Sequence, residues 1–173
     1  MRKAITILGI FISTSLLVYL VYGIISKIDV RMSKDEEIMT LPSFSFPDLS
    51  GRIIHSDSIS EGPVLIVKFH PECEHCQYEI NEILNSPITK TGTKIYLITN
   101  AGKEKTVEYI SGYKVNEVHN LNILLDTAGI FGEIFGRDMV PSNFIYNRDL
   151  ELITALYGEY KVESIMKYLG INE

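Results

Sequence analysis

The chain has 173 residues, 46% of them hydrophobic and 22% charged, and a formal net charge of −6. This length fits one domain with an appendage rather than two full domains, and the apolar content excludes an intrinsically disordered chain. The 16 Lys and Arg residues are outnumbered by 22 Asp and Glu residues. Because nucleic-acid binding needs clustered cations, the sequence predicts no nucleic-acid partner.

Residues 4–25 carry no charge and follow Arg2 and Lys3. A helix of this length spans about 33 Å, which is enough to cross the core of a bilayer. We therefore expect residues 1–26 to form a single-pass anchor in the cell (inner) membrane, with the N-terminus cytoplasmic and the remainder periplasmic or otherwise extracytoplasmic. A cleaved signal peptide and a buried helix of a soluble protein are the competing interpretations. The polar residues 27–41 predict a tether.

Residues 42–173 predict one α/β domain. Strands expected at 42–48 and 52–54 are separated by a Ser-Gly turn and form an N-terminal β-hairpin. Val64–Phe69 is almost entirely apolar, which is typical of a central strand buried on both faces. The other elements follow in chain order: a helix from Cys76 to Leu84, a strand at 94–99, a helix at 104–113 with Val107 and Ile110 facing inward, a strand at 121–125, a short helix closed by Gly136, strands at 142–146 and 150–156, and a helix from Val162 to Leu169. This order predicts a central mixed sheet flanked by helices.

The two cysteines of the sequence, Cys73 and Cys76, lie where the buried strand is expected to end and a helix to begin. Unpaired N–H groups at a helix N-terminus stabilise a thiolate. We expect Cys73 to be the more exposed sulfur, with the lower pKa, and Cys76 to be shielded and to react second. A protonated His75 lowers the pKa of Cys73, and Glu74 raises it. The pair therefore predicts thiol–disulfide exchange.

Two other roles for the cysteine pair stay open. A structural disulfide that closes so short a loop contributes only about 2 kcal/mol, which explains the spacing poorly. A soft ion such as Cu(I) is the second possibility, bound by both sulfurs and one imidazole. The candidate imidazoles are those of His70, His75 and His119.

Several short motifs occur in a fixed order along the chain, and their residues are Pro42, Phe44, Phe46, Asp48, Gly51, Val64–Val67, Phe69, Cys73, Cys76, Asp126, Gly129, Phe135, Gly136, Val140–Ser142, Phe144 and Ile145. Together they resemble the thioredoxin-like superfamily, and within it the membrane-tethered TlpA/ResA-like redoxins. The resemblance implies a thioredoxin-like fold over about residues 42–170. It also implies that Pro141 is a cis-proline facing the cysteine pair, and that the backbone of Val140 binds the substrate. An ordinary trans-proline at a strand start is the alternative.

The sequence departs from this family around the cysteines. The position six before the first cysteine is often acidic or Asn in relatives, and here it is Val67, so a buried proton acceptor is missing. Lys68 and Glu79 are nearby candidates for that role, but we expect both to form surface salt bridges. We expect His70 to be structural rather than catalytic.

The cysteine pair and the resemblance predict an extracytoplasmic, membrane-tethered thiol-disulfide oxidoreductase. Its partners are protein disulfide or dithiol substrates and a membrane or extracytoplasmic thiol electron donor; no cofactor and no resident metal are predicted. A peroxiredoxin-like thiol peroxidase is one alternative, because residues 69–79 partly match the peroxiredoxin pattern. A Sco-like copper-handling protein is another, although that group typically has a longer cysteine spacing.

Overall fold

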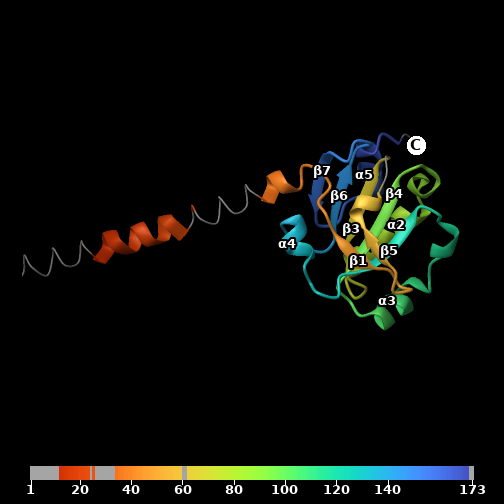
Figure 1. Ribbon diagram of the computed structural model, residues 1–173, viewed down its shortest axis with the longest axis horizontal. Helices are drawn as coiled ribbons and strands as arrows, with labels where there is room; N and C mark the ends of the chain where they lie inside the picture. Colours follow the sequence, from red (N-terminus) through yellow and green to blue (C-terminus); the bar gives the residue numbers. More distant parts are fainter. Residues whose placement is uncertain (1–11, 24, 26–33, 60–61, 172–173) are drawn as a thin grey trace, which may run out of the picture. The chain divides into compact units, whose positions relative to one another are not determined.

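The computed structural model describes residues 12–23, 25, 34–59 and 62–171 (Figure 1). The chain divides into two units, Met1–Glu36 and Glu37–Glu173. Of the predicted anchor, residues 1–11, 24 and 26 lie outside the described residues, as do residues 27–33 of the predicted tether.

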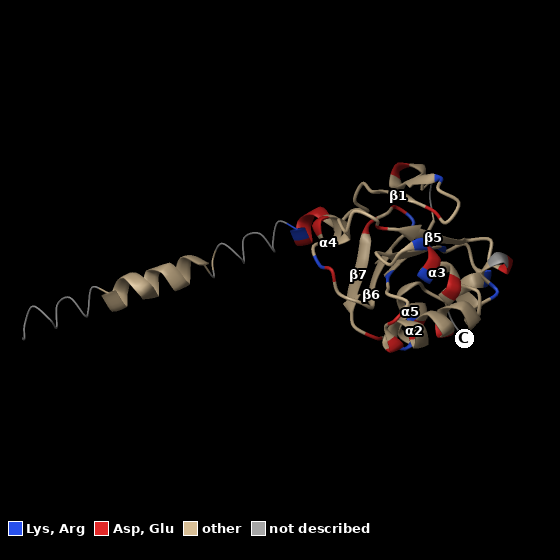
Figure 2. Cartoon of the chain, turned by 90° about the horizontal axis from the view of Figure 1, so that it is seen from below, with Lys and Arg blue, Asp and Glu red and all other residues tan. Residues whose placement is uncertain are grey.

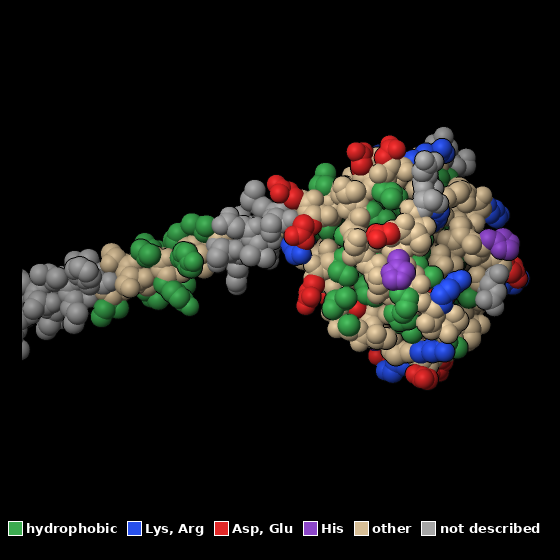
Figure 3. All heavy atoms as spheres, in the orientation of Figure 1, with side chains coloured by type: hydrophobic (Ala, Val, Ile, Leu, Met, Phe, Trp, Pro, Cys, Tyr) green, Lys and Arg blue, Asp and Glu red, His purple; other side chains and the backbone are tan. Residues whose placement is uncertain are grey.

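In the first unit, residues 12–23 are helical. The helix carries no Lys, Arg, Asp or Glu (Figure 2), and its large apolar side chains are exposed, as Figure 3 shows. Within the part of the chain that the structure describes, no helix has both the length and the apolar character needed to cross a membrane.

The second unit is built on a five-stranded sheet with the strand order β5-β4-β3-β6-β7. The strands β3 (Val64–Lys68), β4 (Lys94–Thr99) and β5 (Leu121–Leu125) run parallel to one another. The strands β6 (Ser142–Tyr146) and β7 (Leu152–Tyr157) form an antiparallel hairpin, and β6 also pairs antiparallel with β3. The sheet is therefore mixed, as the order of elements predicts.

Helices and a small second sheet cover the two faces of this sheet. One face carries residues of α2 (Glu74–Asn85) and α5 (Val162–Tyr168), together with the last residue of α3 (Lys103–Ile110). The opposite face carries α4 (Phe131–Phe135) and the two-stranded sheet. That sheet pairs β1 (Ser45–Pro47) antiparallel with β2 (Ile53–His55), and short 3-10 segments lie at Ser56–Ser58, Pro87–Lys90 and Val115–Glu117.

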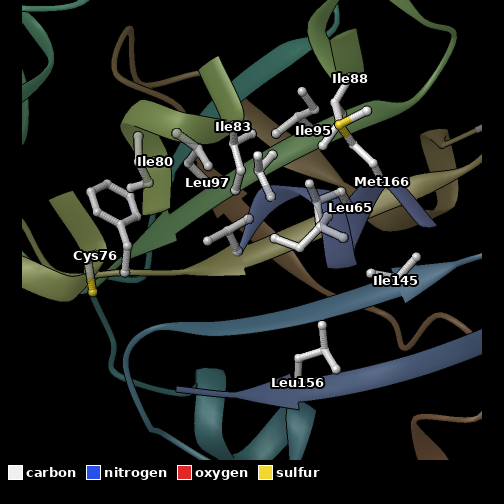
Figure 4. Packing of buried hydrophobic residues seen from close by; sticks show 14 of the residues in the cluster. Leu65, Cys76, Ile80, Ile83, Ile88, Ile95, Leu97, Ile145, Leu156 and Met166 are labelled. Carbon is white, nitrogen blue, oxygen red and sulfur yellow. The ribbon is translucent and has the colours of Figure 1, made fainter. Parts of the chain in front are cut away.

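The two faces have chemically different cores because successive residues of β3 point to opposite sides. Leu65 and Val67 join a mainly aliphatic cluster under α2 and α5 (Figure 4). Cys76 lies at one end of this cluster. Ile66 joins an aromatic cluster on the other face, where the ring centroids of Phe131 and its neighbour Phe135 are 4.4 Å apart.

The predicted inward face of α3 is partly wrong. Ile110 is buried as expected, but Val107 is 42% exposed. The helix begins at Lys103, and its buried residues are Thr106 and Ile110, one turn apart. The hydroxyl of Thr106 donates a hydrogen bond to the carbonyl of Gly102, so the small polar residue is satisfied within the helix and takes the inner position.

The last hairpin also differs from the prediction at one end. The strand expected from Leu150 begins at Leu152. Leu150 has a φ of 62° and belongs to the turn. The side chain of Asn147 accepts hydrogen bonds from the N–H groups of Asp149 and Glu151. These bonds stabilise a turn that is two residues longer than predicted.

Lys68 forms the expected salt bridge, but the bridge is buried rather than at the surface. Its side chain is 1% exposed, and its Nζ lies 3.3 Å from Oδ2 of Asp126 and 3.4 Å from Oδ1 of Asp138. The ammonium also lies 4.9 Å from the ring centroid of Phe131. Because the carboxylate of Asp126 also accepts the N–H of Phe131, this ion pair fastens the end of β3 to the start of α4.

Candidate functional site

The cysteine pair lies at the carboxyl end of β3, where α2 begins, as predicted. Cys73 caps α2, and its Sγ accepts a hydrogen bond from the N–H of Cys76 at 3.3 Å. The N–H of Cys73 in turn donates to the carbonyl of His70. The sulfur of Cys73 therefore has a backbone donor and the N-terminus of a helix beside it.

The two thiols differ in environment. Both are free; Cys73 is partly exposed, whereas Cys76 is fully buried in the aliphatic cluster. Burial raises the pKa of Cys76 to about 12, and the hydrogen bond with the Cys73 side chain and the negative charge of Glu79 act in the same direction. The predicted order of exposure is confirmed, and Cys76 cannot lose its proton at neutral pH without help from its surroundings.

Pro141 lies at the same edge of the sheet as the cysteines. The Val140–Pro141 peptide bond is cis, as the resemblance implies. Ser142, the next residue, pairs with Lys68 across β6 and β3, so the proline is adjacent to the end of the strand that leads into the cysteine motif. Val140 and Cys73 both pack against the cluster that contains Cys76. The substrate-binding role of Val140 and Pro141 stays a prediction.

Glu79 is the clearest correction to the sequence analysis. It is completely buried, not part of a surface salt bridge. Its Oε1 accepts a hydrogen bond from Nδ2 of Asn143 at 2.7 Å, and its Oε2 accepts one from the N–H of Tyr160 at 2.7 Å. Burial raises the pKa of Glu79 although these two hydrogen bonds oppose the shift, and the charge of Glu159 raises it further.

The position of Glu79 accounts for the missing acid at Val67. Val67 is the cross-strand partner of Asn143, and the amide of Asn143 binds Glu79. A buried carboxylate is thus supplied from α2, one turn after Cys76, to the neighbourhood of Val67. The sequence contains a signal for it, because Cys76, Glu79 and Ile80 follow the helical spacing of one inward face.

Three consecutive residues, Gly158–Tyr160, connect separate parts of the site. The N–H of the first donates to the carbonyl of Pro141 at 2.9 Å. The carboxylate of the second contacts Nδ1 of His75, and the N–H of the third donates to Glu79. Sequence reasoning missed this segment because backbone donors have no residue-type signature.

The residues expected to adjust the thiol chemistry lie at the surface. Glu74 is exposed, and the side chain of His75 is 74% exposed and paired with Glu159. The ring of His70 accepts the N–H of Glu72, and its carbonyl accepts the N–H of Cys73; its structural role stays a prediction. The tuning role of Glu74 and His75 stays a prediction.

An aromatic residue of α3 was also missed. The ring of Tyr109 lies 5.9 Å from that of Phe69, and its hydroxyl accepts a hydrogen bond from Tyr113. Burial raises the pKa of Tyr109, and the charges of both cysteines add to this shift. Tyr109 therefore forms part of the apolar surroundings of the thiols.

The metal hypothesis names the two cysteines with His70, His75 or His119. Within the described ranges, no three side chains of His, Cys, Asp or Glu are grouped so as to hold a metal ion. Nδ1 of His70 instead accepts the N–H of Glu72, and Nδ1 of His75 contacts the carboxylate of Glu159.

The buried carboxylate gives the stability of the domain a testable pH dependence. The folded-state pKa of Glu79 is raised above the ordinary value of 4.5, so the folded state binds the carboxyl proton more tightly than the unfolded state does. The free energy of unfolding therefore falls as the pH rises from 4.5 to the folded-state pKa. A tenfold difference in proton affinity corresponds to about 1.4 kcal/mol. Glu79→Gln is therefore expected to gain stability relative to the wild type as the pH rises above 4.5, measured by urea unfolding with the thiols reduced.

The matched control for this measurement is Glu74→Gln, which removes one negative charge from the exposed first turn of the same helix. A difference in unfolding free energy between Glu79→Gln and the wild type that stays constant with pH contradicts the buried titration.

Comparison with solved structures identifies the fold as thioredoxin-like, as the resemblance implies. A secreted disulfide oxidoreductase of Mycobacterium tuberculosis, homologous to E. coli DsbE, matches with a TM-score of 0.65 and 17% identity, over 79% of this chain and 98% of that chain. A thiol:disulfide interchange protein of the thioredoxin family from Chlorobium tepidum matches with a TM-score of 0.62 and 17% identity, over 76% and 94%.

The fold is shared with a peroxide-related protein as well. Peroxidoxin BcpB of Mycobacterium tuberculosis matches with a TM-score of 0.59 and 19% identity, over 76% of this chain and 92% of that chain. No family model and no curated protein matches the sequence. The fold alone therefore does not separate disulfide exchange from peroxide chemistry, and the side chains of the site have to decide.

Proposed function

We propose that this chain is a thiol-disulfide oxidoreductase that reduces protein disulfides through the dithiol of Cys73 and Cys76. One observation carries the proposal: a partly exposed sulfur caps α2 and accepts a backbone N–H, while a second sulfur is buried one turn behind it. This arrangement suits a two-step exchange in which the outer thiol attacks and the inner thiol resolves.

The proposed reaction begins at Cys73. Its thiolate attacks one sulfur of the substrate disulfide, the substrate S–S bond breaks, and the released substrate sulfur takes up a proton. Cys76 then loses its proton and attacks Sγ of Cys73, which releases the second substrate thiolate. Two electrons pass from the dithiol to the substrate, and the Cys73–Cys76 disulfide remains until a thiol donor reduces it.

Glu79 supports the second step. The raised pKa of Cys76 means that its proton needs an acceptor, and the carboxylate of Glu79 lies one turn along the same buried face of α2. General-base assistance of this kind contributes about 10²–10⁴ in rate. Burial keeps the proton on Cys76 until a mixed disulfide has formed at Cys73. The carboxylate of Glu79 then accepts that proton.

The peroxidase alternative assigns peroxide reduction to Cys76. A thiol that is fully buried and has a pKa of about 12 is a poor nucleophile toward peroxide. The copper alternative requires a third ligand, and among the described residues no three side chains of His, Cys, Asp or Glu are grouped so as to hold a metal ion. Both observations favour disulfide exchange.

The deciding experiment uses the full chain purified in detergent. We expect it to accelerate insulin reduction by dithiothreitol, seen as faster precipitation of the free insulin B chain. Consumption of peroxide at a comparable rate without insulin reduction contradicts the proposal in favour of a peroxidase. Stoichiometric Cu(I) binding without thiol exchange contradicts it in favour of copper handling.

The proposal includes an extracytoplasmic site tethered by residues 1–26. Its support is the uncharged sequence of residues 4–25, with Arg2 and Lys3 before it, and the exposed apolar side chains of residues 12–23. In a bacterial host we expect the full chain to stay in the membrane after alkaline carbonate extraction and to keep its full mass. A variant lacking residues 4–25 is expected in the soluble fraction. Recovery of a shortened, carbonate-extractable chain contradicts the anchor and favours a cleaved signal.

A further inference from the structure

Asn143 is the residue of β6 whose side chain binds the buried Glu79. It is fully buried, and Ile145, two positions further along β6 and on the same face, joins the aliphatic cluster. Its Nδ2 donates to Oε1 of Glu79 at 2.7 Å. Its Oδ1 is buried and has no hydrogen-bond partner among the residues that the structure describes. A buried amide with one unused acceptor is unusual, because buried polar atoms are nearly always paired.

The hydrogen bonds of Glu79 fit only its ionised form. Both of its oxygens accept, one from Asn143 and one from the N–H of Tyr160. A carboxylate is an acceptor only, but a protonated carboxyl group carries one O–H that must donate. The N–H of Tyr160 cannot accept a hydrogen bond, so the acceptor has to come from elsewhere.

The side-chain amide of Asn143 carries such an acceptor, Oδ1, beside the donor Nδ2. A half-turn of the amide about χ2 exchanges Nδ2 for Oδ1 at the position facing Glu79. In one orientation the amide donates to the carboxylate, and in the other it accepts from the protonated carboxyl group. The spare Oδ1 of the observed orientation is the atom that the protonated state needs.

We infer that Asn143 is a positioning residue for proton transfer, which turns its amide to donate to Glu79 when that residue is ionised and to accept from it when it is protonated. This inference rests on the proposed function of Glu79 as the proton acceptor for Cys76. Besides Cys76 on its own helix, the charged group that acts on Glu79 is Glu159, before α5, which is itself paired with His75. Asn143 is neutral, so it changes its hydrogen bond without adding charge.

The test compares two substitutions in the full chain in detergent. Asn143→Leu keeps the branched shape of the side chain but can neither donate nor accept, and Asn143→Thr introduces a hydroxyl that can do both. The titration of Glu79 is followed by carboxyl ¹³C NMR with the thiols reduced, assigned by its loss in Glu79→Gln. We expect the midpoint to rise in Asn143→Leu, because a donor to the carboxylate is lost, and to return toward the wild type in Asn143→Thr.

A second readout does not depend on whether either variant folds. In the wild type, the side-chain amide ¹H and ¹⁵N signals of Asn143 are expected to shift with the same pH midpoint as the Glu79 carboxyl signal, and to lose that transition in Glu79→Gln.

A third readout uses the two Asn143 variants. Resolution of a mixed disulfide by Cys76 is expected to slow at least about tenfold in Asn143→Leu and to recover in Asn143→Thr.

The outcomes separate this inference from the proposed function. Amide signals of Asn143 that do not follow the titration of Glu79 overturn the inference, even if insulin is reduced normally. Equal slowing in the Leu and Thr variants also overturns it, because that pattern indicates packing alone. If the amide follows the carboxyl group but insulin is not reduced, the proposed function fails and the coupling between the two side chains stands.

Discussion

The Cys73→Ser variant is expected to lose disulfide reductase activity by a factor on the order of 10³ or more. The remaining sulfur, Cys76, is fully buried, and burial is the largest of the causes that raise its pKa. A buried thiol in apolar surroundings is neither exposed to a protein disulfide nor readily ionised at about pH 7. It therefore cannot replace the outer nucleophile. The measurement is insulin reduction with dithiothreitol, corrected for the rate without protein.

The matched variant is Cys76→Ser, which keeps the outer sulfur and removes the resolving one. It is expected to accumulate mixed disulfides through Cys73, visible as adducts on a non-reducing gel that disappear with reductant. Far-ultraviolet circular dichroism confirms that both variants are folded. Turnover of Cys73→Ser at the wild-type rate, or adducts that persist when Cys73 and Cys76 are both replaced by Ser, contradicts the assignment of the two thiols.

The Lys68→Met variant is expected to lower the free energy of unfolding by about 3–5 kcal/mol. The ammonium of Lys68 is the cation beside the carboxylate of Asp126, and both side chains are 1% exposed. Methionine fills much of the same volume but leaves the buried carboxylate without its countercharge. The N–H groups of Ile130 and Phe131 still donate to that carboxylate, and they limit the loss without removing it. Urea unfolding at pH 7 measures the effect.

The second carboxylate near Lys68 provides the control. Asp138 lies 3.4 Å from the same Nζ, but its side chain is 50% exposed. Asp138→Asn is expected to change stability by no more than about 1 kcal/mol, because an exposed partner is already solvated and screened. If Lys68→Met is as stable as Asp138→Asn, the buried ion pair does not hold β3 and α4 together.

Hydrophobic patterning along the chain was sufficient for the order and type of the elements. The run Val64–Phe69, apolar except for Lys68, predicts a central strand, and β3 is the middle strand of the sheet. The cysteine motif directly after this run predicts a helix N-terminus, and Cys73 caps α2. These features depend on residues adjacent in sequence, so a local pattern determines them.

The same patterning was less reliable for polar residues on buried faces. Lys68 and Glu79 both occupy inward positions of their elements, yet their charges favour a surface assignment. Each is buried because a partner compensates it: Asp126 pairs with Lys68, and Asn143 binds Glu79. Those partners lie 58 and 64 positions away along the chain.

The sequence by itself determined the order of strands and helices and the two thiols at a helix N-terminus, because each follows from local periodicity or from a motif. The cis form of Pro141 was implied by the family resemblance, with a trans-proline as the alternative. Only the tertiary structure decided that a carboxylate lies buried behind the inner thiol, held by an amide from β6 and a backbone N–H before α5. The physical reason is that burying an ionisable group is costly unless specific partners satisfy it. Such partners are brought together by the packing of α2 against the sheet and not by proximity along the chain.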